Sequence, residues 1–179
     1  MAVLAASPAS AEEAKPKNKT LVDFTSQDVE RIGADVRVNK RYAWASGDWE
    51  KKIVFLENRG LLLDLAGGKG NMGGDKAAKL GNFEYAYLII VIGNRNEGGT
   101  LGVKLIDADG TEARWNFPLA AKPIGTALVC KMPLSQPDME EKPGKKPGLD
   151  TNRIKHWQIT GDWQDRKFEV LLVRLGAAS

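Results

Sequence analysis

Residues 83–119 constrain the fold more than any other part of this chain, because they read as three β-strands separated by two glycine-rich turns. Residues 85–92 form an unbroken apolar run rich in β-branched and aromatic side chains. After the glycine- and asparagine-rich segment 93–99, apolar residues alternate with others on both sides of Asp109-Gly110. A period of two around an Asp-Gly turn is typical of a β-hairpin. We therefore expect a sheet-based fold in which these three strands form a meander.

The rest of the chain continues this pattern. Short apolar or alternating segments separated by turn residues lie at 21–24, 36–42, 53–56, 60–65, 126–132, 154–160 and 168–175. No stretch has a sustained period of 3.6, and eight or more short strands indicate an all-β antiparallel sandwich. With 179 residues, we expect a single β-sandwich domain over residues 20–176. The proline- and glycine-rich segment 133–150 predicts a flexible, exposed loop.

Composition excludes several classes of partner. The chain has 26 basic and 23 acidic side chains, a net charge of +3, which is too small to indicate a nucleic-acid partner. No apolar run approaches the ~20 residues of a membrane-spanning helix. We therefore expect neither nucleic-acid binding nor a membrane span.

The N-terminus predicts export. Residues 2–8 are mainly apolar, and Ala9-Ser10-Ala11 before two glutamates has the small-x-small form of a signal-peptidase site. We interpret residues 1–19 as a signal-peptide remnant followed by a charged leader, which predicts a secreted or periplasmic protein; the alternative is an alanine-rich disordered tail. Cys130 is the one cysteine, so an internal disulfide is excluded, and we expect a buried, inert thiol.

A nucleotide-binding motif is present in form only. Residues 68–73 match G-x-G-x-x-G after an apolar strand, but residues 75–79 allow barely one helical turn, and the alternating βαβ units of a dinucleotide-binding fold are missing. We interpret 68–73 as a glycine-rich loop at the edge of the sandwich.

The sequence also offers few groups of residues suited to catalysis or metal binding. His156 is the one histidine, so a metal site of several nitrogen and sulfur ligands cannot form. Asp23, Asp107 and Asp109 are the residue type that binds calcium, but they lack EF-hand spacing. We expect no enzymatic activity.

Two strands predict a polar patch. On the strand that follows the long loop, alternate residues face the core, which leaves His156 and Gln158 on the opposite face. By the same alternation Trp115 faces the core, whereas Arg114 and Asn116 face away from it. If both strands lie in one sheet, these four side chains form a patch able to hydrogen-bond sugar hydroxyls; the alternative is an ordinary solvated strand face.

Tryptophans beside turns are a second candidate. Trp44 and Trp49 lie near a turn, and exposed flat rings stack on the apolar faces of sugars. Gly47-Asp48-Trp49 is echoed by Gly161-Asp162-Trp163. We interpret this echo as one turn chemistry used twice rather than as a repeat.

Three segments together carry a family resemblance: residues 21–24, the run 83–119 with its Asp-x-Asp-Gly and Trp-x-Phe-Pro-Leu, and residues 149–170. The chain resembles the galactose-binding-like β-sandwich of non-catalytic carbohydrate-binding modules, and in particular exported bacterial sandwich domains that often lie beside carbohydrate-active enzymes. The resemblance implies a jelly roll of eight to ten strands that binds a polysaccharide or oligosaccharide.

The resemblance also implies where a ligand and a metal would lie. Related modules often hold one structural calcium near an aspartate of the final strand, but residues 171–175 carry no carboxylate, so no cofactor is assigned. Ligands of such modules lie on the concave sheet face, here Arg114, Asn116, His156 and Gln158, or at the loops of one end, here Trp44, Trp49 and Asn94–Asn96. We favour the face.

Two other functions stay open at this point. The first is a structural or protein-interaction domain of an exported or cell-envelope assembly, which would engage a protein partner through an apolar or charged patch. The second is a small glycan hydrolase or lyase, which would require converging titratable residues in a cleft.

Overall fold

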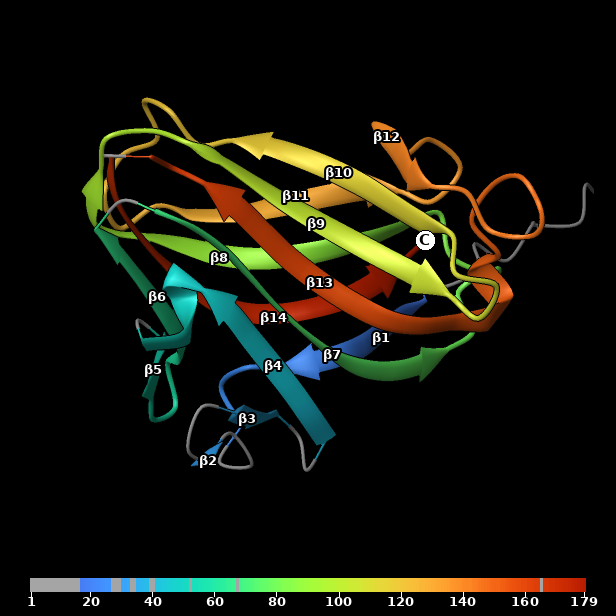
Figure 1. Cartoon of the computed structure of the whole chain (residues 1–179), viewed down its shortest axis with the longest axis horizontal. Helices are drawn as coiled ribbons and strands as arrows, with labels where there is room; N and C mark the ends of the chain where they lie inside the picture. Colours follow the sequence, from blue (N-terminus) through green and yellow to red (C-terminus); the bar gives the residue numbers. More distant parts are fainter. Residues whose placement is uncertain are drawn as a thin grey trace, which may run out of the picture.

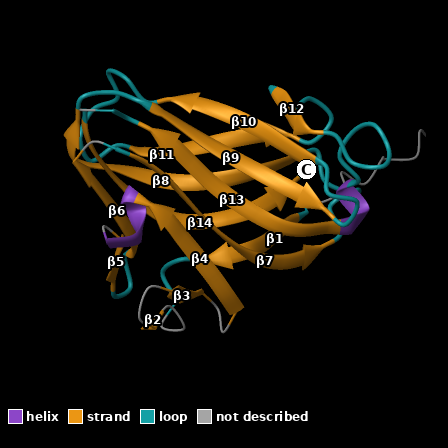
Figure 2. Ribbon diagram, in the orientation of Figure 1, coloured by secondary structure: helices purple, strands orange, loops and turns teal. Residues whose placement is uncertain are grey.

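A computed structural model describes residues 17–26, 30–32, 35–38, 41–51, 53–66, 68–164 and 166–179. They form two antiparallel β-sheets packed face to face, with two short 3₁₀ helices at the ends of strands (Figures 1 and 2). The expected all-β sandwich is therefore confirmed. The signal-peptide segment and most of the charged leader lie outside the described residues.

Sheet A has six strands in the order β11-β8-β14-β6-β5, and β1 also pairs with β14. The bounds are β1 Asn18–Asp23, β5 Ile53–Leu56, β6 Gly60–Ala66, β8 Tyr85–Asn96, β11 Ala127–Pro133 and β14 Lys167–Ala178.

Sheet B has eight strands in the order β12-β10-β9-β13-β7-β4-β3-β2 and lies in front of sheet A in Figure 1. The bounds are β2 Glu30–Ile32, β3 Asp35–Val38, β4 Arg41–Gly47, β7 Lys69–Ala78, β9 Thr100–Asp107, β10 Glu112–Pro118, β12 Met139–Lys142 and β13 Ile154–Asp162. The two 3₁₀ helices are η1 Asp48–Lys51 and η2 Thr151–Arg153.

The core lies between the sheets and follows the predicted alternation. Trp115 of β10 and Trp157 of β13 are buried, and the ring of Phe24 packs edge-on against Trp157 at 5.6 Å between centroids. His156 and Gln158, the neighbours of Trp157, lie on the opposite face and are partly exposed. Burial of aromatic rings supplies much of the apolar area that stabilises a sandwich of this size.

One half of the predicted meander is confirmed and the other is wrong. β9 and β10 pair as a hairpin with Arg114 opposite Lys104. β8, however, pairs with β11 and β14 of sheet A, so the chain crosses between the sheets after Asn96. The crossing uses Gly98, whose φ of 95° favours glycine. None of residues 85–92 is fully exposed on either face of β8, which explains why this run lacks an alternation of apolar and polar residues.

The glycine-rich segment 68–73 is a strand, not the loop that we expected from the sequence. Residues from Lys69 onward belong to β7, which lies between β13 and β4 in sheet B. Its glycines make room for rings on both faces: a Cβ at Gly70 would collide with Trp49, and a Cβ at Gly73 would lie 2.6 Å from Cζ2 of Trp44. Close approach of an aromatic ring is thus the physical reason for glycine here.

The segment 133–150 is largely exposed, as expected, but it also contains a strand. β12 pairs with the edge strand β10, with Arg114 opposite Met139. This pairing brings the side chain of Glu141 to sheet B. Among the described residues, no helix is both long and apolar enough to cross a membrane.

Candidate functional site

The outer face of sheet B carries a row of side chains that crosses five strands. Strand register places Trp44 of β4 opposite Gly73 of β7, Gly73 opposite Gln158 of β13, Gln158 opposite Lys104 of β9, and Lys104 opposite Arg114 of β10. Residues opposite one another in adjacent strands lie on the same face. We call this set the Trp44–Arg114 row.

Two further rows flank it on the same face. One side holds Ser46, Asn71, Thr160, Gly102 and Asn116. The other side holds Asp75, His156, Ile106 and Glu112. The structure therefore brings the four predicted patch residues, on β10 and β13, onto one face with only β9 between their strands.

Trp44 belongs to this face and not to the loop site in which we expected it. Its indole lies over Gly73 and is partly exposed, and its centroid lies 6.4 Å from that of His156 at an interplanar angle of 70°. Nδ1 of His156 lies 2.8 Å from Oδ1 of Asp75, which fixes the imidazole beside the indole. The result is an aromatic platform with a polar edge.

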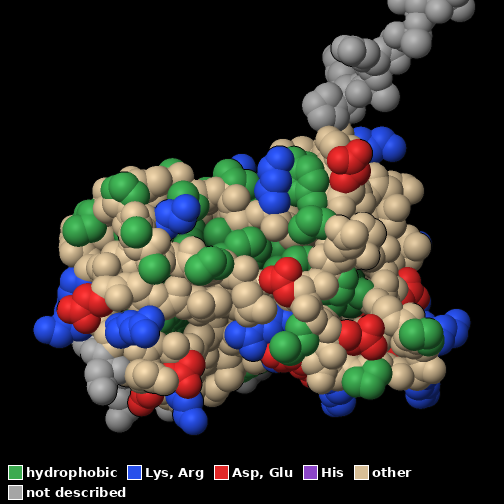
Figure 3. Space-filling view, turned by 90° about the horizontal axis from the view of Figure 1, so that it is seen from above, with side chains coloured by type: hydrophobic (Ala, Val, Ile, Leu, Met, Phe, Trp, Pro, Cys, Tyr) green, Lys and Arg blue, Asp and Glu red, His purple; other side chains and the backbone are tan. Residues whose placement is uncertain are grey.

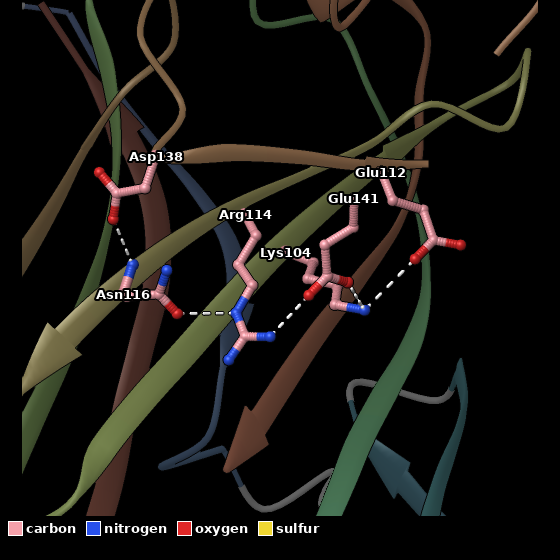
Figure 4. A network of polar contacts seen from close by, with 6 residues as sticks. All are labelled: Lys104, Glu112, Arg114, Asn116, Asp138 and Glu141. Carbon is pink, nitrogen blue, oxygen red and sulfur yellow. Dashed lines mark hydrogen bonds and ion pairs between the residues drawn. The ribbon is translucent and has the colours of Figure 1, made fainter. Parts of the chain in front are cut away.

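The other end of the row is a network of charged side chains (Figure 4). Arg114 donates from Nε to Oδ1 of Asn116 at 2.7 Å and from Nη1 to Oε1 of Glu141 at 2.6 Å. Lys104 pairs with Oε2 of Glu141 and, at 3.3 Å, with Oε2 of Glu112. The two oxygens of Glu141 thus join the two basic residues of the row.

Glu141 is held as an anion by this arrangement. Burial by itself would raise the pKa of its carboxyl group, but the hydrogen bonds from Lys104 and Arg114 and their positive charges together hold that pKa below its ordinary value of 4.5. The neighbouring Asp138 accepts a 2.6 Å hydrogen bond from the backbone amide of Asn116. Both contacts fasten the 133–150 segment to β10.

A hollow of about 340 Å³ lies on this face between β4, β7, β10 and β13. Three glycines, Gly47, Gly70 and Gly161, lie among its lining residues. Its polar lining consists of Ser46, Lys69, Asn71, Arg114, Thr160 and Asp162. The volume lies in the range of small-ligand sites, and hydroxyl, amide and guanidinium groups converge in it.

The predicted loop site does not assemble. Trp49 has no exposed surface: its ring stacks on Trp163 at 5.1 Å and 11°, so it cannot stack on a ligand. The Gly-Asp-Trp echo therefore builds one stacked pair in the core. Asn94 lies in β8 of sheet A, where its backbone amide and Nδ2 donate to Oε1 of Glu169. It is remote from the Trp44–Arg114 row because the two lie in different sheets.

Cys130 and the three aspartates considered as calcium ligands have structural surroundings in the described part of the chain. Cys130 is buried, and burial raises the pKa of its thiol to about 12, so it is the inert cysteine expected. No three His, Cys, Asp or Glu side chains of the described residues gather as metal ligands. Asp107 accepts from the backbone amides of Asp109, Thr111 and Asp150, which organises the β9–β10 turn and the start of η2.

Sequence reasoning missed several polar residues of the face, among them Lys104, Asp75 and Glu141. Lys104 could have been found, because the hairpin register across Asp109-Gly110 puts it opposite Arg114. Asp75 was missed because β7 was not predicted: residues 68–73 were interpreted as a loop, and residues 75–79 were considered only as a possible helical turn. Glu141 gave no signal, since nothing local shows that its charged, proline-rich segment returns to β10.

A larger hollow, of about 710 Å³, lies at one end of the sandwich. Phe83, Tyr85, Lys131 and Leu134 line it, and Nζ of Lys131 lies 4.6 Å from the centroid of the Tyr85 ring. Figure 3, the view from above, shows hydrophobic side chains at the surface on the side where β10 and β11 lie. None of the predicted site residues lines this hollow.

Comparison with known proteins gives matches to solved structures. No family model and no curated protein matches the sequence. The family 11 carbohydrate-binding module of the cellulosomal cellulase Lic26A-Cel5E of Clostridium thermocellum is similar in structure, with a TM-score of 0.51 and 14% sequence identity. The match covers 90% of this chain and 94% of that chain. A family 11 module from the same organism, solved in complex with a β-1,3-1,4-mixed-linked tetrasaccharide, matches with a TM-score of 0.51 and 16% sequence identity. This match covers 89% of this chain and 94% of that chain.

Part of a larger protein is also similar. An agarase, AgWH50C, matches with a TM-score of 0.55 and 9% identity over 88% of this chain and 26% of that chain. At these identities the similarity lies in the fold. The chain has the β-sandwich fold found in carbohydrate-binding modules, which confirms the fold class that the resemblance implied, although the described residues form fourteen strands rather than eight to ten.

Proposed function

We propose that this chain is a non-catalytic carbohydrate-binding module that holds a glycan on the outer face of sheet B. The observation that carries the proposal is the Trp44–Arg114 row. It places an aromatic platform and hydrogen-bonding side chains in one line across five strands. A flat ring packs against the apolar face of a sugar while amides and guanidinium groups bind its hydroxyls.

The shape of the site favours an extended ligand. Adjacent strands lie about 4.8 Å apart, so four intervals separate the backbones of Trp44 and Arg114 by about 19 Å. The hollow beside the row adds hydrogen-bonding groups from β7 and β13, among them Asn71 and Thr160. An oligosaccharide segment lying across the strands would contact the platform, Gln158 and the hollow together. The similar module that was solved with a tetrasaccharide supports a ligand of this kind.

We further infer that the module acts outside the cytoplasm, in the secreted fraction or the periplasm. The support is the small-x-small motif at Ala9–Ala11, which ends an apolar stretch as signal peptides do.

One observation favours a second function, a protein-interaction domain of an exported assembly. The outer face of sheet A carries an aliphatic row in which Ala127, Val91, Leu171, Leu62 and Val54 face one another across five strands. Val54 and, on the same sheet, Val129 are about half exposed. Apolar surface of this kind is typical of protein contacts.

Affinity electrophoresis through gels that contain soluble polysaccharides tests the proposal. We expect one class of polymer to retard the wild-type chain, and Trp44→Ala, Arg114→Ala and His156→Ala to reduce that retardation. Tyr85→Ala and Arg95→Ala are matched controls, because they remove an aromatic ring and a guanidinium group from the sheet A side. Retardation by no polymer would overturn the proposal and favour the protein-interaction function. Equal loss in the controls would place the site elsewhere.

A further inference from the structure

Two basic side chains of the Trp44–Arg114 row converge on a single carboxylate supplied by the chain itself. Oε1 of Glu141 accepts from Arg114 while Oε2 pairs with Lys104. A guanidinium group and an ammonium group placed on either oxygen of one carboxylate form a recognition site for an anion with at least two oxygens. Lys104 and Arg114 therefore form a site that can bind an oxyanion, whether the chain itself or a ligand supplies it.

The two basic groups are held in place independently of Glu141. Nε of Arg114 donates to Asn116, and the guanidinium group lies close to Gly102, where an added Cβ would come within 2.7 Å of Nε and 2.8 Å of Nη2. Lys104 retains Glu112 as a partner and has a side chain only 12% exposed. Nη2 of Arg114 has no hydrogen-bond partner among the described residues. Arg114 is also one of the residues that line the hollow.

Glu141, in contrast, comes from a short edge strand, which contacts such as those of Asp138 and of Glu141 itself hold against β10. β12 has four residues at the edge of sheet B, pairs with β10 alone, and has a register irregularity between Glu112 and Ala113. Its flanks contain Pro137, Pro143 and two glycines, and most of its side chains are exposed. A segment of this kind separates from its neighbour at lower free energy than a central strand does.

We infer that the glycan bound by this face is acidic, and that its carboxylate or sulfate group takes the place of Glu141 between Lys104 and Arg114. The inference rests on the proposed function, because it names the class of ligand for the same face. Replacing one carboxylate by another preserves the charge-assisted hydrogen bonds, while stacking on Trp44 and contacts along the row are gained. Glu141 acts as a built-in competitor whose effective concentration lowers the apparent affinity.

The test uses the full chain and polymers that differ only in their charge. Polygalacturonate is compared with its methyl ester, and a sulfated galactan with unsulfated agarose, by affinity electrophoresis at about 0.15 M ionic strength, where weak surface attraction is screened. We expect retention by one acidic polymer and at least ten-fold weaker binding to its neutral counterpart, since charge-assisted hydrogen bonds are lost. The acidic polymer that binds distinguishes a carboxylate ligand from a sulfate ligand.

Matched variants separate displacement of Glu141 from a general charge effect. We expect Glu141→Gln to strengthen binding of the acidic polymer about ten-fold, because it weakens the internal competitor, and Lys104→Ala to weaken it. Glu140→Gln makes the same change in net charge at an exposed neighbour and is expected to alter binding less than two-fold.

Three other outcomes would contradict these expectations. Binding of neutral polymers without preference for acidic ones would overturn the inference and leave the proposed function standing. Equal strengthening by Glu140→Gln and Glu141→Gln would also overturn it, since attraction would then depend on net charge alone. Retention by none of the polymers would overturn the proposed function itself.

Discussion

Each sheet places an aromatic ring over a strand glycine on its outer face, but the two rings differ in their access to solvent. On sheet B the indole of Trp44 lies over Gly73 and is partly exposed. On sheet A the ring of Tyr87 lies over Gly176, is 6% exposed, and donates its hydroxyl to Oδ1 of Asn18 at 2.8 Å. A ring packed over a strand glycine is therefore buried and hydrogen-bonded on sheet A but open to solvent on sheet B.

The difference arises from what lies beside each ring. β1 pairs with β14, and a Cβ at Gly176 would also lie 2.8 Å from the carbonyl oxygen of Lys19. Tyr87 thus fastens β1 to the sandwich. Trp44 has polar neighbours instead, His156 among them. A ring that is buried and hydrogen-bonded contributes to stability, whereas a ring left open to solvent beside hydrogen-bonding groups is available to a ligand.

The largest expected effect comes from exchanging the two rings for alanine. Tyr87→Ala should lower the free energy of unfolding by about 3 kcal/mol, because it removes a buried ring and leaves Asn18 without its donor. Trp44→Ala should lower it by less than about 1 kcal/mol while weakening glycan binding by about 2 kcal/mol, as loss of an aromatic anchor does. Urea denaturation and affinity electrophoresis measure the two quantities. An equal loss of stability in both variants would show that Trp44 is a structural ring.

A smaller effect is expected from Gly73→Ala, which tests whether the indole of Trp44 needs the space above this glycine. The new Cβ would lie 2.6 Å from both Cζ2 of Trp44 and the carbonyl oxygen of Trp157. Overpacking of this kind costs about 1–3 kcal/mol and should displace the ring, so glycan binding weakens together with stability.

Gly110→Ala is the matched control for that change. Its φ of 91° disfavours alanine, but its Cβ would meet no atom within 4 Å. It should therefore destabilise the β9–β10 turn by about 1 kcal/mol and leave binding unchanged. If it weakens binding as much as Gly73→Ala does, general destabilisation and not the position of Trp44 explains the result.

The smallest effect concerns the charged end of the row. The folded-state pKa of Glu141 lies below its ordinary value of 4.5, so its ion pairs stabilise the protein above that pH and are lost as the pH falls through the folded-state pKa. Glu141→Gln should lower the free energy of unfolding at pH 7 by at most about 1 kcal/mol, and the difference from wild type should shrink toward pH 3.

Urea titrations at both pH values, with Glu140→Gln as the control, measure this difference. Glu140 contacts neither Lys104 nor Arg114 in the described part of the chain; its Oε2 accepts from the backbone amide of Gly148. A pH-independent difference for Glu141→Gln would mean that the ion pairs do not form in solution.

The local pattern of the sequence predicts most of the strands and the side chains of two of them that point away from the core. Alternation around Trp115 and Trp157 is a local property with a period of two, so it placed Arg114, Asn116, His156 and Gln158 on the outward faces of their strands. The Asp109-Gly110 turn fixed the pairing of β9 with β10, because its neighbours in the sequence are also neighbours in space. The buried state of Cys130 followed from its apolar surroundings in the same way.

Which strands share a sheet, and which side chains lie beside one another on each face, depends on tertiary contacts. Residues 69–73 look like part of a loop in isolation, but they pair with β4 and β13 as a central strand, and Trp44 and Trp49 pack on their glycines. Trp49 is buried by Trp163, more than a hundred residues away. Glu141 reaches Arg114 by a pairing that no local pattern encodes. Contacts of this kind depend on non-local packing, and a pattern that repeats every two residues contains no information about it.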